Sequence, residues 1–519
     1  MTIANPTRGR RKGPRQGLLH RSSLGALAIS GAGALRLAFQ FAVLPILARI
    51  VGPGEYGLVS LAMPFILLAN VVADGGLVLA LGRQRDASPA LESTTFWIAS
   101  AVGAALALLT CAAAVPIGVA MREPRLPVLI VALAPILVMN SLTVVSNGRI
   151  IRERRFALFA AGDLMSAVAG AATALVAAMH GWGAWSLVAQ QLVLWVCKLA
   201  WLTLRGGVRI RLIFRFEEAR GVLVFGANNL GSMLADYISR NVDNMIVGAA
   251  LGATTLGYYA MAYQVIRVPD MLITGPFYYY IFTALSRAEH SGDRTAVQRL
   301  TEGCLRLGSA ALAPLFCGLA LTADLAVPLV LGPKWLAAIE ALRWLAAAGF
   351  GFCVCSMMAA MLTGVGRASL QFRLSIFLGA VTVLTVGGGV HFGLEATSAS
   401  LAGGMALVSV FYIDQLSRDL KTPRRALFAA FGPAATGCVA LAGTLLAVRR
   451  LLRHEPPNVV FVLSLLVGLA AYALVVWARS RNQLLADLRA FASAQEDASP
   501  PDRPEETANT GNAQLTPAA

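Results

Sequence analysis

Charged residues are scarce in this chain, since Asp, Glu, Lys and Arg make up only 13% of its 519 residues. Apolar residues make up 57%, and the mean hydropathy is +0.67. A water-soluble protein of this length needs far more polar surface. The composition therefore excludes a soluble globular protein and predicts a protein that lies in a lipid bilayer.

Residues suited to catalysis or metal binding are few, and their spacing fits neither a metal site nor a catalytic triad. The five histidines lie in tails or at loop edges: His20, His180, His290, His391 and His454. The seven cysteines lie in or beside apolar runs, without the spacing of metal ligands or of a disulfide framework: Cys111, Cys197, Cys304, Cys317, Cys353, Cys355 and Cys438. The loops on the outer side are also too short for a catalytic domain. We therefore expect no enzyme, no metal and no cofactor.

Apolar stretches of about twenty residues recur along the chain, and each is long enough to cross about 30 Å of hydrocarbon as a helix. They predict an all-α polytopic membrane protein of about fourteen helices. The expected spans are 24–50, 56–81, 94–120, 126–147, 157–179, 184–204, 221–251, 257–285, 305–331, 336–364, 374–390, 396–416, 426–448 and 459–477.

These spans predict five segments. A basic cytoplasmic tail, 1–22, precedes an N-lobe of six helices, 23–205, and a C-lobe of six more, 206–420. Two further helices occupy 421–481, and a tail rich in Ala, Pro, Glu and Thr, 482–519, is expected to be disordered in the cytoplasm.

The distribution of Lys and Arg predicts the orientation. The net charge is +16, but the cations form short clusters and no continuous basic face, which argues against a nucleic-acid partner. With the N-terminus in the cytoplasm, the cytoplasmic tails and loops hold 31 Lys and Arg residues, and the outer side holds 7. This bias follows the positive-inside rule, so we expect a bacterial inner-membrane protein with both termini in the cytoplasm. Arginines near residue 450 are a local exception: Arg449, Arg450 and Arg453.

Tryptophans at the outer span ends are typical of an aromatic belt: Trp182, Trp185 and Trp335.

A weak internal repeat appears at an offset of 200 residues. Gly52 and Gly57 recur as Gly252 and Gly257, each pair in the tight outer turn after the first helix of a lobe. Six helices preserve orientation, so the lobes are expected to be parallel repeats related by an axis along the membrane normal. Such a pair frames a central cavity.

A charged residue inside a span costs roughly 2.5–3.5 kcal/mol unless it faces protein or water. Six of the charged residues inside the expected spans cluster in equivalent helices. They lie in the first, seventh and eighth spans: Arg36, Asp236, Arg240, Asp243, Arg267 and Asp270. In one interpretation the three arginines face a wet cavity and attract an anionic substrate. The three aspartates then balance charge or couple transport to an ion.

The other interpretation is structural pairing. Asp236 and Arg240 are four residues apart, and Arg267 and Asp270 are three apart, so each pair can neutralise itself along its helix. The sequence leaves both interpretations open for these pairs. Arg36 has no carboxylate nearby in its helix, which favours the cavity for that residue.

Four stretches match the signatures of one known family. The stretch 47–57, LARIVGPGEYG, together with 241–248, NVDNMIVG, and 256–259, LGYY, resembles the first-turn and second-lobe signatures of the polysaccharide-transport flippases of the O-antigen and exopolysaccharide (Wzx) type. The stretches 181–188, GWGAWSLV, and 331–335, LGPKW, resemble later turns. The residues that carry the match include Arg49, Gly52, Gly57, Asp243, Gly252, Gly257 and Trp335.

The resemblance implies the fold of the multidrug/oligosaccharidyl-lipid/polysaccharide (MOP) exporters, MATE-like, with two six-helix lobes and two extra helices. It implies a flippase that moves undecaprenyl-pyrophosphate-linked oligosaccharide repeat units from the cytoplasmic to the periplasmic leaflet, with exopolysaccharide members fitting best. Implied partners are the lipid-linked oligosaccharide, membrane lipids, and the polymerase and chain-length or export proteins of the same pathway. Coupling to H⁺ or Na⁺ is left open.

Three alternatives remain beside this hypothesis. A MATE-like cation-coupled drug or metabolite antiporter would share the two lobes and the acids inside spans. A membrane polymerase or ligase for lipid-linked glycans would need a large external loop, which the chain lacks. A non-transport component of a polysaccharide assembly complex would leave the charges inside the spans unexplained.

Overall fold

The structure is a computed structural model that describes residues 39–84, 87–208 and 210–496, except for the side chains of 228, 232, 235, 236, 239, 240 and 488–496. Helices connected by short turns make up the described residues, without a strand among them. Twelve helices there are long and apolar enough to cross a membrane, so the expected all-α membrane class is confirmed. The count of fourteen stays a prediction, because most of the first expected span lies outside the described residues.

The N-lobe begins in the described residues with the short apolar helix Phe39–Val51. Its other helices are α2 (Pro53–Asp74), α3 (Leu77–Arg83), α4 (Pro89–Ala120), α5 (Leu126–Leu133), α6 (Pro135–Arg152), α7 (Phe156–Met179) and α8 (Ala184–Arg205). The expected span 56–81 is broken at Gly75 and Gly76, which both have positive φ, so the chain turns there with little strain.

The C-lobe begins with the long helix α9 (Phe216–Pro269). It continues with η1 (Asp270–Thr274), α10 (Gly275–His290), α11 (Arg294–Val330), η2 (Pro333–Trp335), α12 (Ala338–Gly364), α13 (Ala368–Gly389), η3 (Val390–Phe392) and α14 (Leu394–Leu420). The last helices are α15 (Arg424–Ala429), α16 (Gly432–Leu451) and α17 (Pro457–Glu496). Since α17 runs to Glu496, the first part of the expected tail 482–519 is helical, which corrects the expectation of disorder there.

The turns at Gly52 and Gly252 show that the repeat is structural. Gly52 has φ 77° and ψ 165°, and Gly252 has φ 81° and ψ 171°. Both turns therefore have the same backbone conformation, which residues other than glycine rarely adopt. The second turn divides α9 into two antiparallel halves, which correspond to the expected spans 221–251 and 257–285. We name the end of the bundle with these turns the Gly52 end, and the opposite end, where α3 finishes, the Arg83 end.

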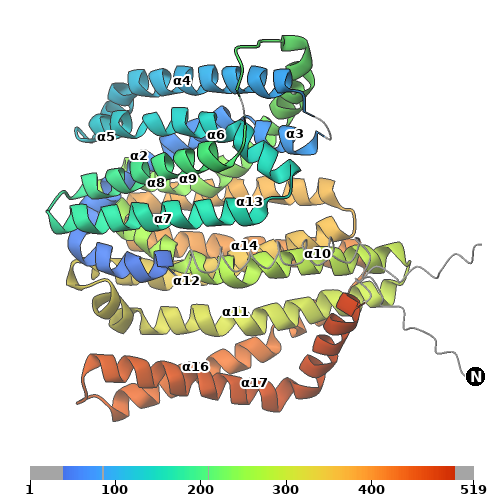
Figure 1. The fold of residues 1–519 in the computed structure, drawn as a ribbon. Helices are drawn as coiled ribbons and strands as arrows, with labels where there is room; N and C mark the ends of the chain where they lie inside the picture. The colour runs from blue at the N-terminus through green and yellow to red at the C-terminus, as the bar shows by residue number, and fades with distance from the viewer. Residues whose placement is uncertain (1–38, 85–86, 209, 497–519) are drawn as a thin grey trace, which may run out of the picture.

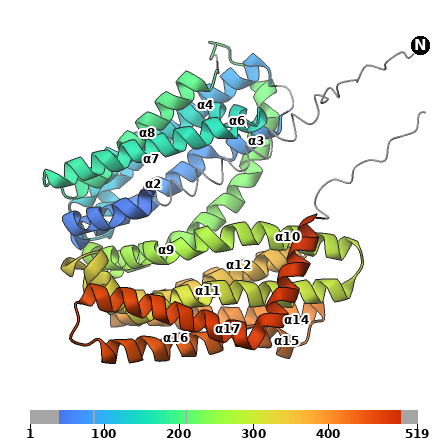
Figure 2. The same ribbon diagram turned by 60° about the horizontal axis from the view of Figure 1, so that its bottom comes forward.

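The two lobes lie side by side, with α2–α8 in one and α10–α17 in the other (Figures 1 and 2). The first half of α9 starts against the N-lobe, where Ala219 and Val222 pack with Leu77, and then runs toward the C-lobe. Figure 2 shows the ribbons of the lobes close together at the Gly52 end and farther apart at the Arg83 end. The largest apolar core extends across both lobes.

Candidate functional site

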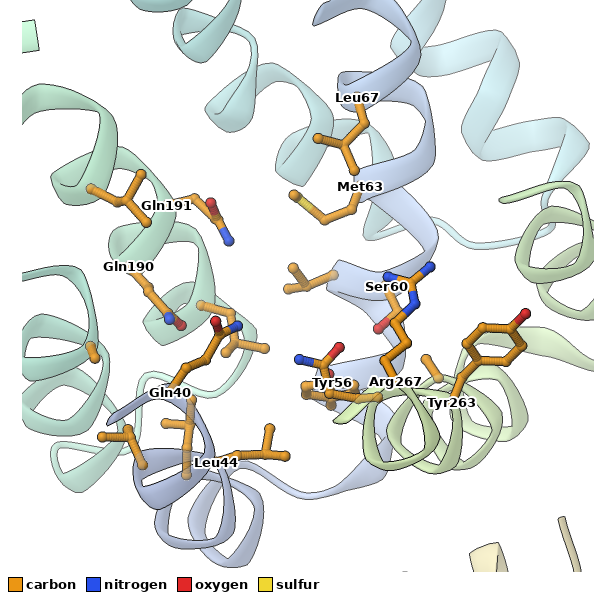
Figure 3. Close-up of a pocket in the computed structure, with 18 of the residues that line it drawn as sticks. Gln40, Leu44, Tyr56, Ser60, Met63, Leu67, Gln190, Gln191, Tyr263 and Arg267 are labelled. Carbon is orange, nitrogen blue, oxygen red and sulfur yellow. The ribbon is translucent and has the colours of Figure 1, made fainter. Parts of the chain in front are cut away.

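A cavity of about 420 Å³ lies between the lobes, and it is lined by residues of the helix Phe39–Val51, α2, α7, α8 and both halves of α9. Figure 3 shows α8 on one side of this space and α2 with α9 on the other. The cavity therefore lies between the lobes, as the parallel repeat predicts. Two of its walls come from α2 and the second half of α9, which are equivalent helices in the repeat.

The walls from α2 and α9 use the same positions of the repeat. The α2 wall includes Ser60, Met63, Pro64 and Leu67, and the wall from the second half of α9 consists of Ala260, Tyr263, Gln264 and Arg267. In each helix these residues follow the spacing i, i+3, i+4, i+7, which puts them on one face. The two faces are related by the offset of 200 residues, but the α9 face is the more polar one and carries a charge.

Amide side chains supply most of the remaining polar lining. They come from four helices: Gln40, Gln190, Gln191, Asn241, Asn244 and Gln264. Figure 3 shows the amide groups of Gln40, Gln190 and Gln191 directed into the space between α8 and α2. Asn241 donates to the carbonyl of Tyr237 at 2.9 Å, and the buried Oδ1 of Asn244 has no partner in the described structure. An amide can donate and accept at once, which suits it to hydroxyl groups.

Arg267 is the single Lys or Arg among the described residues of the lining. Its guanidinium lies 5.4 Å from the ring centroid of Tyr263 and points toward Ser60 (Figure 3). In the described structure no ion pair joins Arg267 to Asp270, whose Oδ1 instead accepts from the Sγ of Cys353 at 3.7 Å. The charge of Arg267 is therefore directed to the cavity rather than cancelled along the helix. Arg36 lies outside the described residues, as do the side chains of Arg240 and Asp236.

Two predicted aspartates lie beside the cavity rather than in its lining. Asp243 is 2% exposed, and its carboxylate accepts hydrogen bonds from the backbone N–H of Asn244 at 2.8 Å and from the hydroxyl of Tyr259 at 3.1 Å. Asp270 begins the π-helical turn η1, directly after Pro269. Such turns inside α-helices are frequent at functional sites. In the described part of the chain, no group of three or more His, Cys, Asp or Glu is placed to hold a metal ion.

At the Gly52 end the lobes meet without space between them. A Cβ added to Gly57 would lie 1.8 Å from the carbonyl oxygen of Ala253, and one added to Gly257 would lie 2.0 Å from that of Pro53. These two contacts are equivalent under the repeat. Only glycine allows α2 and α9 to approach this closely, which explains why both positions are glycine.

Three further residues join the lobes at this end. Arg49 donates to the carbonyls of Leu329 and Val330 at the end of α11, and Lys334 donates to the carbonyl of Ile50 at 3.3 Å. Each cation thus binds the carboxyl end of a helix from the other lobe, where the helix dipole favours positive charge. With the glycine contacts, Arg49, Lys334 and Trp335 form what we name the clasp.

The position of Trp335 corrects the expectation of a membrane-interface residue. Its side chain is fully buried between Tyr56 and Tyr258, with ring centroids 5.8 and 6.1 Å away, and its indole N–H donates to the carbonyl of Ala48 at 2.9 Å. Two other tryptophans at this end are exposed as expected: Trp182 and Trp185. Trp335 is therefore part of the contact between the lobes.

Glu55, next to the clasp, holds turns of the N-lobe together. Its carboxylate accepts two hydrogen bonds from Arg125, at 2.8 and 2.9 Å, and one from the backbone N–H of Ala184 at 2.9 Å. The hydrogen bond to Glu55 raises the pKa of Arg125, and burial opposes it. The hydrogen bond from Ala184 holds α2 against the start of α8 beside the cavity.

The amide lining and the burial of Trp335 were not predicted from the sequence. A signal for the first was present, because Gln190 and Gln191 are adjacent amides in the middle of an apolar span. A polar group in a span usually faces protein or water. No local signal indicated the burial of Trp335, because the carbonyl that it binds lies 287 residues away.

Comparison with known proteins agrees with this architecture. A family model described as "Polysaccharide biosynthesis protein" matches residues 46–340. The succinoglycan biosynthesis transport protein ExoT of Rhizobium meliloti (strain 1021) is 25% identical over 458 residues, which cover 86% of this chain and 90% of ExoT. The lipopolysaccharide biosynthesis protein WzxC of Escherichia coli (strain K12) is 24% identical over 342 residues, which cover 64% of this chain and 68% of WzxC.

Among solved structures, the lipid II flippase MurJ in its inward closed conformation is similar, with a TM-score of 0.71 at 12% identity. The match covers 88% of this chain and all of the MurJ chain. At this identity the likeness concerns the fold alone, and it confirms the expected all-α polytopic membrane fold. The family model and the relatives confirm the resemblance carried by the stretch 47–57.

Proposed function

The chain belongs to the polysaccharide biosynthesis protein family, and we propose that its task is to flip undecaprenyl-pyrophosphate-linked oligosaccharide repeat units. The direction is from the cytoplasmic to the periplasmic leaflet of a bacterial inner membrane. The Gly52 end faces the periplasm in this proposal, because the excess of Lys and Arg lies on the other side. No catalytic step is involved.

The observation that supports the proposal most is the chemistry of the central cavity. A pyrophosphate cannot cross about 30 Å of hydrocarbon without cationic or hydrated walls. Arg267 supplies a guanidinium, which can bind a phosphate through two parallel hydrogen bonds. The surrounding amides of Gln40, Gln190 and Gln191 can donate to and accept from sugar hydroxyls. The polyprenyl chain needs no protein and stays in the lipid.

The contacts between the lobes support alternating access as the mechanism. The clasp closes the Gly52 end, so the headgroup enters the cavity from the side of the Arg83 end. Outward opening then requires the two lobes to rock apart at Gly57 and Gly257 and the hydrogen bonds of Arg49, Lys334 and Trp335 to break. Each broken bond raises the free energy of the outward state, so the bound headgroup must stabilise that state.

The other charged residues inside the expected spans have two roles in the proposed mechanism. Arg36 and Arg240 join Arg267 in attracting the anionic headgroup. Asp236, Asp243 and Asp270 balance that charge or couple transport to H⁺ or Na⁺. We expect the flipped unit to pass to the polymerase and to the chain-length or export proteins of the same pathway.

The test is to assign lipid-linked oligosaccharide to a leaflet in inner-membrane vesicles from cells with and without this protein. The downstream polymerase is disabled, so that the flipped unit is not consumed. We expect the unit to accumulate on the cytoplasmic face after depletion and to reach the periplasmic face when the intact protein returns. Normal translocation without the protein would refute the proposal.

A further inference from the structure

A second pocket, of about 490 Å³, lies within the C-lobe and is lined by residues of α11, α12, α14 and α16. It shares no lining residue with the central cavity. Its charged residues lie near helix ends at the Gly52 end: Glu340 and Arg343 near the start of α12, Glu395 in the first turn of α14, and Arg449 in the last turn of α16. The pocket therefore lies at the level where lipid headgroups meet water.

The rim of this pocket carries charges of both signs. Arg449 binds both carboxylate oxygens of Asp324, at 3.0 and 3.1 Å, and the carbonyl of Leu321 at 2.9 Å. Arg343 binds Glu340 at 2.6 Å and lies 3.7 Å from Asp324. Glu395 is exposed in the same lining and has no ion-pair partner among the described residues. Counting Asp324, three carboxylates face two guanidinium groups.

The rest of the lining is apolar and open to the outside of the bundle. Trp344 is 42% exposed and Leu446 is 60% exposed, and Ala347 and Ala442 also line the pocket. In a membrane these surfaces contact acyl chains. One pocket thus combines a charged rim at headgroup level with an apolar wall at chain level.

We propose that this pocket binds a phospholipid with a phosphoethanolamine headgroup from the leaflet at the Gly52 end. The ammonium group pairs with Glu395, the phosphate binds Arg343, and an acyl chain lies over Trp344 and Leu446. Because the lining holds two cations and two carboxylates, a zwitterion satisfies both signs. A purely anionic headgroup would leave Glu395 unpaired beside added negative charge, and a choline headgroup has no N–H to donate to it.

The test measures the thermal midpoint (Tm) of the full-length purified protein in detergent with added lipid. The added lipids share acyl chains and differ in headgroup: phosphatidylethanolamine, phosphatidylcholine or phosphatidylglycerol. A ligand that binds only the folded state raises Tm with its concentration, so we expect phosphatidylethanolamine to raise it by about 2–4 °C more than the others. Glu395→Gln should remove this difference. Glu289→Gln, which changes an exposed carboxylate near the Arg83 end, should keep it.

A second variant tests the apolar wall without touching a charge. Ala347→Phe fills the pocket from α12, where Ala347 is exposed, so it should also remove the preference for phosphatidylethanolamine while the protein remains folded. Equal Tm shifts with all three lipids, or a preference that survives both Glu395→Gln and Ala347→Phe, would overturn the site. A larger shift with phosphatidylglycerol would overturn the headgroup class. If free phosphoethanolamine raised Tm as much as phosphatidylethanolamine does, the ligand would not need to be a lipid, and that part of the proposal would be wrong.

Discussion

Helix α2 and the second half of α9 are equivalent in the repeat, yet they agree in one region and differ in another. In their first turns both carry glycine, at Gly57 and Gly257, and each glycine packs under a backbone carbonyl of the other helix. Two to three turns later the same faces line the cavity, where Leu67 corresponds to Arg267. The contact between the lobes thus keeps the symmetry of the repeat, while the substrate cavity departs from it. The close contact between the lobes at the Gly52 end needs the same backbone shape in both helices, whereas binding of an anionic substrate needs a positive charge on one wall of the cavity.

The largest expected effect comes from adding a methyl group to the symmetric contact. Gly57→Ala or Gly257→Ala would place a Cβ within 2.0 Å of a carbonyl oxygen, so the helices must separate. Overpacking of this kind costs typically 1–3 kcal/mol and occasionally more. We expect a clear loss of thermal stability for each variant in detergent, measured by unfolding of the purified protein.

Gly403→Ala in α14 is the matched control, since a Cβ there meets nothing within 4 Å. In a helix interior, Ala is favoured over Gly by about 1 kcal/mol, so this control should be neutral or stabilising. If Gly57→Ala were as stable as Gly403→Ala, the close approach of α2 and α9 would be wrong.

A smaller effect is expected from Trp335→Phe, which keeps an aromatic ring between Tyr56 and Tyr258 but removes the donor to the carbonyl of Ala48. The carbonyl of Ala48 keeps its hydrogen bond from the backbone N–H of Gly52 at 3.3 Å, so the variant loses one hydrogen bond, about 0.5–1.5 kcal/mol. Because the bond joins the lobes, its loss should favour the state that is open at the Gly52 end. Accessibility of a cysteine introduced at Ser60 to a thiol reagent added from that end should rise.

Trp182→Phe serves as the comparison, because Trp182 lies at the same end but is exposed and outside the clasp. It should leave labelling of the cysteine at position 60 unchanged. Equal labelling in the Trp182 and Trp335 variants would mean that Trp335 does not hold the lobes together.

The smallest effect is expected on the amide wall of the cavity. Gln191→Leu removes one donor and one acceptor opposite Arg267, and a neutral hydrogen bond contributes about 0.5–1.5 kcal/mol. We therefore expect roughly a 2- to 10-fold rise in the substrate concentration needed for half-maximal transport. Gln191→Glu, which adds negative charge near the phosphate, should impair transport more than Gln191→Leu. The opposite order would indicate that this wall does not face an anion.

The parts of the fold that follow local rules could be predicted from the sequence. Apolar runs gave the spans, and the offset between Gly52 and Gly252 gave the repeat, because a turn with positive φ requires glycine in both copies. The expected span boundaries agree best where a turn follows an apolar run, as at Met179 and Ala184. They do not predict the break at Gly75 inside the span Pro53–Arg83, because this break leaves the hydropathy unchanged.

The site depended on contacts between distant parts of the chain, and these could be predicted only in part. A charge inside a span singled out Arg267, but its spacing from Asp270 fitted an ion pair equally well, and only the helix packing decides between them. Trp335 was predicted to be a membrane-interface residue from its place at the end of an expected span. Its burial could not be predicted, because the carbonyl that it binds, that of Ala48, belongs to the other lobe. The charged lining residues of the second pocket come from three helices, α12, α14 and α16, so no single stretch of sequence contains the pocket.

The most direct test of the account is transport of lipid-linked oligosaccharide by the purified protein in liposomes, with the charge of the α9 wall removed. Arg267→Leu gives α9 the residue that α2 carries at the equivalent position, and hydrogen bonds to a charged group contribute about 1.5–3 kcal/mol. We predict that transport falls about tenfold or more, that Arg267→Lys retains part of it, and that Leu67→Arg in the Arg267→Leu background restores part of it. Wild-type transport by Arg267→Leu at equal protein level would contradict the account.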